Sequence, residues 1–283
     1  MIKNVALSTI LLVIMAVCSP DTSAQDSKSK EKPSETPLVE LTTSYGVIKI
    51  KLSDLTPKHR DNFLKLARAG FYDSLLFHRV ISNFMIQGGD PESKHAEAGK
   101  MLGNGDVGYT IPAEFNDALY HKKGALCAAR TENPEKASSG CQFYIVQGSK
   151  FTDNDLSMTE ERINQTRKQS GLAKLFADPK NADKRARFME LRNNKQTDSL
   201  NIYYKTELEP LLAKEAAPFK YTEEQKKSYT TTGGTPHLDQ GYTVFGEVVE
   251  GLDVIDQIAA TKTATGDRPL EDVRMTVRVL EKK

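Results

Sequence analysis

FHRVISNFMIQGGD, residues 77–90, is the most informative stretch of this 283-residue chain. If Arg79 and Gln87 lie near each other, they offer a cation and an amide beside Phe84 and Met85. An apolar surface with a polar edge is the general form of a small-ligand site. The alternative is a barrel strand whose arginine pairs with a surface carboxylate.

Strand-like segments lie on both sides of this stretch. Residues 39–43 and 47–52 flank a Tyr-Gly pair and therefore predict a hairpin. Up to about Gln147, short apolar runs alternate with turns that contain Gly or Pro. Strand character returns at residues 242–245, and a last strand is expected from Met275 to Leu280. This spacing predicts an antiparallel barrel or sandwich.

Two helices are expected to accompany these strands. The first has Thr56 as its cap and Pro57 at its first position, and Gly70 ends it. The second is short and carries apolar residues from Val254 to Ala259. Both show apolar side chains at helical spacing, which predicts one buried face on each.

Residues 151–232 differ in character, because they are rich in charged side chains and poor in glycine. Residues 157–160 and 222–225 both match a capping box, a local signal for the start of a helix. Apolar residues between Leu200 and Leu212 follow a helical period, and Pro210 is expected to kink or limit that helix. The segment therefore predicts a helical insertion of several segments.

The stretch 77–90 resembles the signature of cyclophilin-type peptidyl-prolyl cis/trans isomerases. Three further segments resemble the motifs that follow it in that family, in the same order: GALCAA at 124–129, SGCQFYI at 139–145, and HLDQGYTVFG at 237–246. Four ordered motifs are far more specific than one pattern match. Together they place residues 38–150 and 233–281 in the resemblance.

The resemblance implies a mainly β fold. It is a closed antiparallel cyclophilin-like β-barrel of about eight strands, capped by two helices. The domain is then expected to span residues 38–283 and to be interrupted by the helical insertion at 151–232. The insertion leaves the barrel just after the strand of Tyr144 and returns just before His237, so we expect its root beside the site.

The resemblance also implies roles for single residues. Arg79 matches the catalytic arginine, and Gln87 matches the polar residue beside it. The implied substrate-binding residues are Phe84, Met85, Ala129, Tyr144, His237, Leu238 and Tyr242. Tyr144 stands where the family usually has Phe, and Tyr242 replaces a His, as in bacterial members. His237 replaces the Trp of eukaryotic members, which implies weak cyclosporin binding.

The expected reaction is rotation about an Xaa-Pro peptide bond in unfolded or proline-containing polypeptides. No bond breaks, so no nucleophile, metal or cofactor is required. We expect the enzyme to assist the folding of exported proteins, and we expect a monomer. The alternative is a non-catalytic cyclophilin-like module that binds peptides or acts as a chaperone.

Several other functions are disfavoured. The 39 Lys and Arg nearly balance the 38 Asp and Glu, so nothing in the charge favours nucleic acid. Residues 103–108 match Gly-x-Gly-x-x-Gly, but Pro112 follows where a nucleotide-binding helix would run. A glycine-rich surface loop beside the groove is expected instead. No motif places a Ser/His/Asp or Cys/His grouping for a hydrolase.

Structural roles are expected for Cys127, Cys141 and His78. An oxidising compartment would permit a bridge between the two cysteines, but we favour two buried thiols. His78 lacks a ligand-spaced partner and is expected to be a hydrogen-bonded structural residue.

The first 24 residues match a signal peptide. Lys3 supplies the positive charge, residues 5–17 are apolar, and small residues precede a cleavage site after Ala24. Residues 25–37 then form a polar tether. We therefore expect export, most simply to a bacterial periplasm. Cys18 directly follows the apolar run and leaves a second interpretation, a membrane-anchored lipoprotein.

Two hypotheses account for the insertion. It could widen the surface that contacts unfolded polypeptide, as a chaperone-like arm. It could also be a solvated helical appendage that only packs on the barrel. Amphipathic helices serve either purpose.

Overall fold

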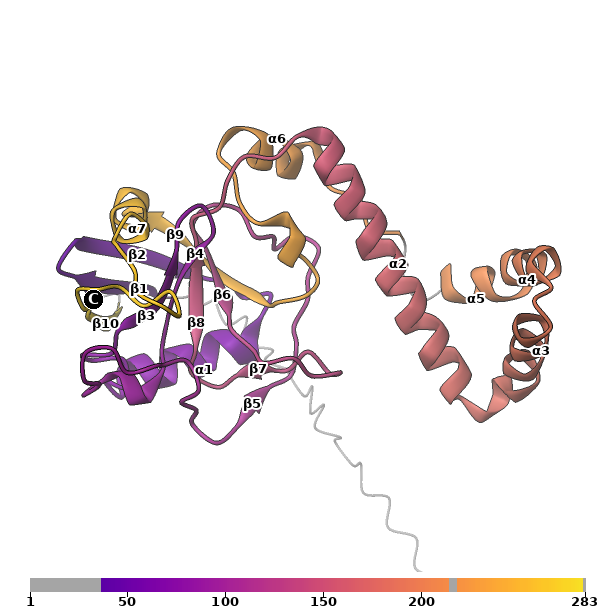
Figure 1. The fold of residues 1–283 in the computed structure, drawn as a ribbon, viewed down its shortest axis with the longest axis horizontal. Coiled ribbons are helices and arrows are strands. Elements are labelled where there is room, and N and C mark those ends of the chain that lie inside the picture. Colours follow the sequence, from indigo (N-terminus) through magenta and orange to yellow (C-terminus); the bar gives the residue numbers. More distant parts are fainter. Residues whose placement is uncertain (1–36, 214–217, 282–283) are drawn as a thin grey trace, which may run out of the picture. The chain divides into compact units, whose positions relative to one another are not determined.

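A computed structural model describes residues 37–213 and 218–281 (Figure 1). These residues belong to one compact unit that begins at Thr36. The predicted signal peptide, the candidate lipid site Cys18 and nearly all of the tether lie outside the described residues. None of the described helices is long and apolar enough to cross a membrane.

Eight strands form one antiparallel sheet in the order β10-β1-β2-β9-β6-β8-β4-β3. Their bounds are β1 Leu38–Thr43, β2 Gly46–Leu52, β3 Phe77–Ile81, β4 Met85–Gly88, β6 Ala125–Ala128, β8 Phe143–Val146, β9 Val244–Glu250 and β10 Met275–Leu280. Two short strands, β5 (Thr110–Ile111) and β7 (Ser138–Ser139), pair separately. The predicted β1–β2 hairpin is confirmed, and Gly46, the first residue after its turn, takes a φ of +139° that glycine accepts readily.

The sheet curls into a barrel whose closure is incomplete. The edge strands are β3 and β10, and the segment just before β3 pairs with the start of β10, where Leu76 and Arg274 form an isolated antiparallel bridge. The amide of Phe77 donates to the carbonyl of Val273 at 2.9 Å at the same place. The predicted closed barrel of about eight strands is therefore correct in strand number and pairing. Its closure is partial, since a short run of hydrogen bonds and one isolated bridge join the two edges in place of a continuous ladder.

Two helices pack into the same core, as predicted. α1 (Pro57–Arg68) buries Phe63 and Leu66, and α7 (Leu252–Ala259) buries Ile255 and Ile258. These side chains join one cluster with the inward-facing residues of the strands. Burial of a side chain of this size stabilises the fold by about 1.5–3 kcal/mol. This core fixes the barrel on which the cleft is built.

The start of α1 corrects one prediction. Pro57 is at the first helical position, but the Thr56 side chain makes no capping hydrogen bond and its buried hydroxyl has no partner among the described residues. The Glu114 carboxylate instead accepts from the amides of Lys58 and His59, at 3.1 and 3.0 Å. A carboxylate at the positive end of a helix satisfies two unpaired amides at once. A residue more than 50 positions away therefore replaces the local cap.

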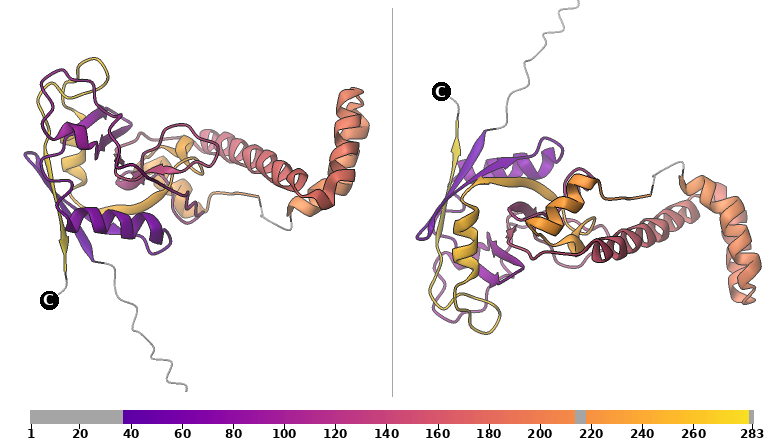
Figure 2. Two further views of the ribbon diagram at one scale, coloured as in Figure 1. Left: turned by 90° about the horizontal axis from the view of Figure 1, so that it is seen from below. Right: turned by 90° about the horizontal axis from the view of Figure 1, so that it is seen from above.

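The insertion is helical, as predicted. Its elements are α2 (Asp153–Ala177), η2 (Pro179–Asn181), α3 (Ala182–Asn193), α4 (Thr197–Tyr203), a π-helical turn η3 (Tyr204–Leu208), α5 (Glu209–Ala213) and α6 (Glu223–Thr231). The π-helical turn ends two residues before Pro210, which has no amide to continue the α-helical pattern. The N-terminal part of α2 contacts α6, and its later turns contact α3 and α5 (Figures 1 and 2).

One of the two predicted capping boxes is wrong. Thr222 and Gln225 do form a reciprocal box at the start of α6. α2, however, begins earlier than residue 157, where Thr152 and Asp155 make the box. Ser157 lies inside the helix, and its hydroxyl donates to the carbonyl of Asp153 one turn back at 2.9 Å. Ser and Thr commonly form this bond within helices, so the local pattern alone was misleading.

The insertion has a well-packed root. The segment that leaves the barrel and the segment that returns to it are its two limbs. They share a buried cluster of Leu156, Ile163, Phe219, Tyr221 and Tyr229. Asn164 and Phe219 join the limbs by two hydrogen bonds, Nδ2 to the carbonyl at 2.9 Å and the amide to Oδ1 at 2.7 Å. We call residues 151–164 and 219–232 the root, and residues 165–213 the distal part.

Candidate active site

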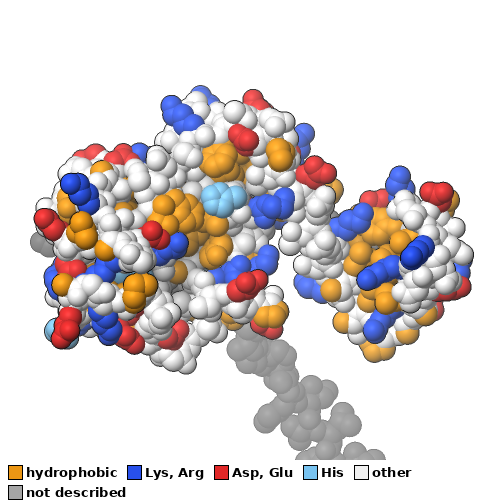
Figure 3. Space-filling model, in the orientation of Figure 1, with side chains coloured by type: hydrophobic (Ala, Val, Ile, Leu, Met, Phe, Trp, Pro, Cys, Tyr) orange, Lys and Arg blue, Asp and Glu red, His pale blue; other side chains and the backbone are white. Residues whose placement is uncertain are grey.

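A cleft of about 260 Å³ brings together almost all of the predicted site residues. Its lining consists of His78, Arg79, Phe84, Met85, Gln87, Leu102, Gly103, Asn104, Ala129, Arg130, Tyr144, Leu238 and Tyr242. Of the nine predicted residues, His237 alone does not line it. His237 stacks instead on the outer side of the site against Phe84, with ring centroids 5.7 Å apart. Figure 3 shows hydrophobic side chains gathered on the barrel, beside a histidine.

The β3–β4 hairpin positions the polar edge of the cleft. Arg79 and Gln87 are direct cross-strand partners, so their side chains project from the same face. Phe84 lies in the turn between them, and its carbonyl accepts from the amides of Gln147 and Gly148 at 3.0 and 2.9 Å. The tight turn takes Asn83 to a positive φ of 61°, which asparagine tolerates better than most residues. One hairpin thus brings together the side chains of a motif that is continuous in the sequence.

Arg79 both pairs with a surface carboxylate and lines the cleft, which are the two possibilities that the sequence left open. Its Nε donates to Asp267 Oδ2 at 3.3 Å, and both side chains are more than 40% exposed, at 43% and 45%. A pair this exposed contributes at most about 1 kcal/mol of stability. Because Asp267 engages Nε, the terminal guanidinium nitrogens can donate toward the cleft. The arginine is therefore oriented by a carboxylate and still lines the cavity.

Gln142 orients Gln87 and was not predicted as a site residue. The Gln142 amide group donates to the carbonyls of Gly103 and Gly105 at 2.9 and 2.8 Å. Its oxygen must then face Gln87, whose Nε2 donates to it at 3.1 Å. This arrangement leaves the oxygen of Gln87 to accept a hydrogen bond from a ligand or from Arg79.

The glycine-rich segment at 103–108 forms a loop on the cleft, as expected. Gly103 and Asn104 line the cavity. Asp90, which is fully buried, accepts from the amides of Gly103 and Glu92. A Cβ on Gly105 would lie 1.9 Å from the Asp90 carboxylate, so the loop requires glycine there. These glycines serve close packing and not nucleotide binding.

The apolar wall is built from Met85, Ala129, Leu238 and two tyrosines. Met85 and Tyr144 are almost completely buried, at 2% and 4% exposure. Tyr242 meets Tyr144 edge-on, with centroids 5.9 Å apart, and the Arg130 guanidinium lies 4.6 Å from the Tyr242 ring centroid. Rigid aromatic walls of this kind suit a small apolar ring such as pyrrolidine.

His78 differs from its prediction. It belongs to β3, with its ring near Gly103 of the glycine loop, and is 2% exposed, but neither ring nitrogen has a hydrogen-bond partner among the described residues. Burial lowers the pKa of His78 to about 4, against a smaller upward effect of the Asp90 charge. His78 is therefore a neutral ring at physiological pH, and it is held by packing.

A Ser–His–Glu grouping does exist in the structure, although no motif predicted it. His59 Nδ1 lies 2.7 Å from Glu114, and its Nε2 lies 3.0 Å from Ser138 Oγ. His59 and Ser138 are only 2% and 1% exposed, so no substrate carbonyl can reach the hydroxyl. The grouping holds the start of α1 to β7 and is not a hydrolase site.

The two cysteines of the described chain are free and buried, which confirms the preferred interpretation. Burial raises the pKa of Cys141 to about 11 and that of Cys127 well above its usual value. No group of three His, Cys, Asp or Glu within residues 37–213 and 218–281 is arranged to hold a metal.

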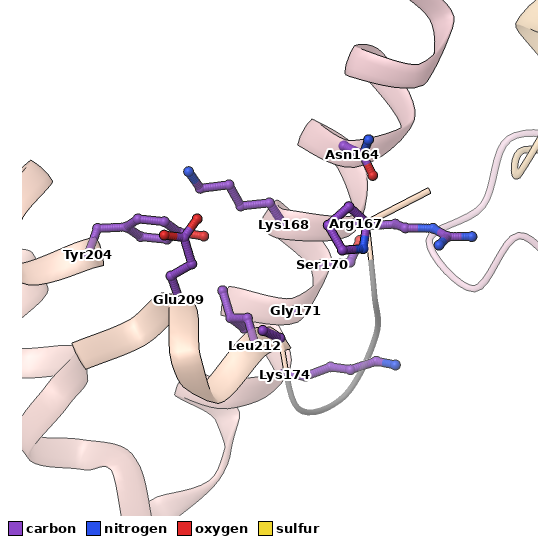
Figure 4. A pocket seen from close by; sticks show the side chains of 11 residues that line it. Asn164, Arg167, Lys168, Ser170, Gly171, Lys174, Tyr204, Glu209 and Leu212 are labelled. Carbon is purple, nitrogen blue, oxygen red and sulfur yellow. The ribbon is translucent and has the colours of Figure 1, made fainter. Parts of the chain in front are cut away.

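A second hollow lies in the insertion, between α2 and α5. Lys168, Lys174 and Glu209 are among its lining residues, and the Lys168 ammonium lies 3.6 Å from the centroid of the Tyr204 ring (Figure 4). None of the nine predicted site residues contributes to it. The barrel cleft is therefore the candidate active site.

Comparisons with known proteins identify the family of this chain. Residues 38–160 and 220–279 match the family model described as cyclophilin type peptidyl-prolyl cis-trans isomerase/CLD. A putative peptidyl-prolyl cis-trans isomerase of Staphylococcus saprophyticus is 30% identical over 241 residues, which cover 84% of this chain and 89% of that protein. A similar protein of Staphylococcus haemolyticus is 30% identical over 236 residues, which cover 83% of this chain and 86% of that protein.

Two further matches add less to the family assignment. A putative bifunctional phosphatase/peptidyl-prolyl cis-trans isomerase of Streptococcus pyogenes is 32% identical over 246 residues and 84% of this chain, but the match spans only 37% of that protein. A cyclophilin-type isomerase of Cryptosporidium parvum, solved in the presence of the dipeptide Ala-Pro, has a TM-score of 0.48 at 17% identity, with 87% of this chain and 99% of that chain covered.

Proposed function

This chain belongs to the family of cyclophilin-type peptidyl-prolyl cis-trans isomerases, and we propose that its cleft isomerises Xaa-Pro bonds in unfolded proteins outside the cytoplasm. The observation that carries the proposal is the cleft itself. Arg79 and Gln87, which are cross-strand partners, line it together with the apolar residues Met85, Tyr144 and Leu238, and this combination supports the proposal.

The chemistry follows from the physics of the amide bond. An Xaa-Pro bond isomerises in roughly 10–100 s unaided, because amide resonance must be broken. In the twisted state the prolyl nitrogen regains a lone pair that neither planar state offers. A donor placed near that nitrogen stabilises the transition state more than the ground states, and each tenfold in rate requires about 1.4 kcal/mol.

The cleft supplies these elements from its own residues. Arg79 donates to the twisted nitrogen, and its guanidinium is kept in position by Asp267. The apolar wall holds the pyrrolidine ring while the preceding carbonyl rotates. The Gln87 oxygen, oriented by Gln142, accepts from the substrate backbone or steadies Arg79. Covalent chemistry is not needed, because only a torsion changes.

Export and folding assistance are part of the proposal. The leader at residues 1–24 supports export, with cleavage after Ala24 preferred to lipid attachment at Cys18. Export would place the cleft among unfolded chains that have just crossed a membrane. Mass spectrometry of the mature protein distinguishes an N-terminus at Gln25 from a lipid-modified cysteine.

A protease-coupled assay on an Ala-Pro tetrapeptide tests the catalytic claim. Replacing Arg79 with Ala removes the donor, and we expect kcat/KM to fall about 100- to 1000-fold, as for the loss of one transition-state donor elsewhere. Arg68→Ala is the matched control, because Arg68 is an exposed arginine of α1 that pairs with Glu281. If wild type and Arg79→Ala are equally inert, the chain is the alternative, a non-catalytic peptide-binding module.

A further inference from the structure

A buried network connects the cleft to the root of the insertion. The Tyr144 hydroxyl, at the cleft wall, lies 3.0 Å from His121 Nε2. His121 Nδ1 lies 2.7 Å from Asp239 Oδ1. Asp239 Oδ2 accepts from the hydroxyls of Tyr221 and Tyr229, each at 2.6 Å. The network therefore runs without a break from the apolar wall to the insertion.

The direction of each hydrogen bond follows from its partners. A carboxylate only accepts, so the Nδ1–H of His121 donates to Asp239, and Nε2 is left to accept from the Tyr144 hydroxyl. The His121 amide also donates to Asp239 Oδ1, at 2.9 Å. Burial raises the pKa of Tyr144, Tyr221 and Tyr229, so all three remain O–H donors at physiological pH. Asp239 thus accepts four hydrogen bonds in a site that is 3% exposed.

The position of Asp239 makes the network relevant to the cleft. It directly follows the 3-10 turn η4 (Pro236–Leu238), which carries Leu238 into the wall and His237 onto Phe84. An incompletely bonded carboxylate at this depth would be strongly destabilised, so its four donors fix the turn. Two of those donors come from the insertion and two from the barrel segment at His121.

We infer that Asp239 is a positioning residue for the cleft, and that Tyr221 and Tyr229 make the returning limb of the insertion part of the substrate-site assembly. The inference rests on the proposed function, since it concerns the same cleft. Tyr144 explains why the connection exists in this chain. Its hydroxyl, which a phenylalanine lacks, joins the ring to His121.

The test uses the double variant Tyr221→Phe/Tyr229→Phe in the full chain. Both rings and their packing remain, but Asp239 loses two of its four donors. We expect the dissociation constant of an Ala-Pro tetrapeptide, measured by NMR titration, to rise about 3- to 10-fold, which corresponds to about 0.7–1.4 kcal/mol. Because Arg79 and Asp267 lie outside the network, we expect kcat at saturation to change less than twofold.

Two further variants make the result specific. Tyr203→Phe is the control, because this tyrosine is in the distal part and its hydroxyl donates to the Lys184 carbonyl, at 3.4 Å, outside the Asp239 network. Tyr144→Phe cuts the network at the cleft end. When Tyr144→Phe is added to the double variant, we expect the dissociation constant to rise by less than the product of the two separate rises. Both changes act through the same chain of hydrogen bonds.

A lowered melting temperature with unchanged binding and unchanged kcat would reduce the network to a structural role and overturn the inference. Fully independent effects of Tyr144→Phe and the double variant would overturn it as well. The proposed function fails separately, if the wild-type chain and Tyr203→Phe show no isomerase activity.

Discussion

The side chain of His78, at the cleft, makes the free energy of unfolding depend on pH. Its ring is buried beside Arg79 without a hydrogen-bond partner among the described residues, and burial lowers its pKa to about 4. In the unfolded chain its pKa returns to about 6.5. Between these values the unfolded state binds one more proton than the folded state. Acidification through this window therefore favours unfolding, and the stability is fully present only above pH 6.5.

Replacement of His78 with Phe is expected to remove this dependence. Between pH 7 and pH 4, the wild type should lose about 3 kcal/mol more unfolding free energy than the variant, because the variant has no ring to protonate. Urea denaturation at the two pH values measures the difference. His95→Gln serves as control, since His95 is exposed. Equal losses in wild type and His78→Phe would show that His78 does not titrate as proposed.

The sequence predicted which side chains would lie together where those residues are close in the chain. Arg79, Phe84, Met85 and Gln87 fall within nine positions, and one hairpin brings them to one edge of the cleft. Gln142 lay inside a recognised motif, but its role depends on the carbonyls of the glycine loop. Asp267 is 188 positions from Arg79 and carries no local signal. Partners of this kind are specified by the fold and not by spacing.

At the scale of elements, the start of α1 separates local from tertiary capping. Thr56 has the sequence features of a cap, but its hydroxyl is buried without a partner among the described residues. The Glu114 carboxylate holds the first turn from a distant loop and also bonds His59 Nδ1. The local signal thus identified the correct helix end but the wrong side chain.

This difference predicts opposite results for two substitutions. Glu114→Ala should lower the unfolding free energy by about 1–3 kcal/mol, because two helix amides and a buried imidazole lose their acceptor. Thr56→Val keeps the shape of the side chain and removes only an unpaired hydroxyl, so it should be neutral or slightly stabilising. Chemical denaturation of both variants measures the contrast. A larger loss for Thr56→Val would restore Thr56 as the cap.

At the scale of the whole molecule, the insertion has two parts with different structural surroundings. The root shares a buried cluster and the Asp239 network with the barrel. The family match ends at residue 160 and resumes at residue 220, close to the Asn164–Phe219 pair that joins the limbs. The distal part exposes Met189 at 39% and Ile202 at 63%, and hydrophobic side chains gather among Lys and Arg over α3–α5 (Figure 3). We propose that this surface contacts client polypeptides.

Deletion of residues 170–217, closed by a short glycine linker, tests that role without disturbing the root. We expect activity on a tetrapeptide to stay within about twofold, because the cleft and its network are intact. Refolding of a protein limited by proline isomerisation should slow, because the client loses a binding surface that raises its local concentration at the cleft. Unchanged acceleration of refolding would leave the distal part as an appendage.

The sequence by itself determined the family, the strand and helix pattern, and most of the cleft, because these depend on alternation, helical period and motifs that are local along the chain. Only the tertiary structure decided how far the barrel closes, which carboxylate caps α1, and how Asp239 joins the insertion to Tyr144. Those features are pairings between segments tens to hundreds of residues apart. Their energy comes from the burial of polar groups with complete hydrogen bonding, which no local pattern encodes.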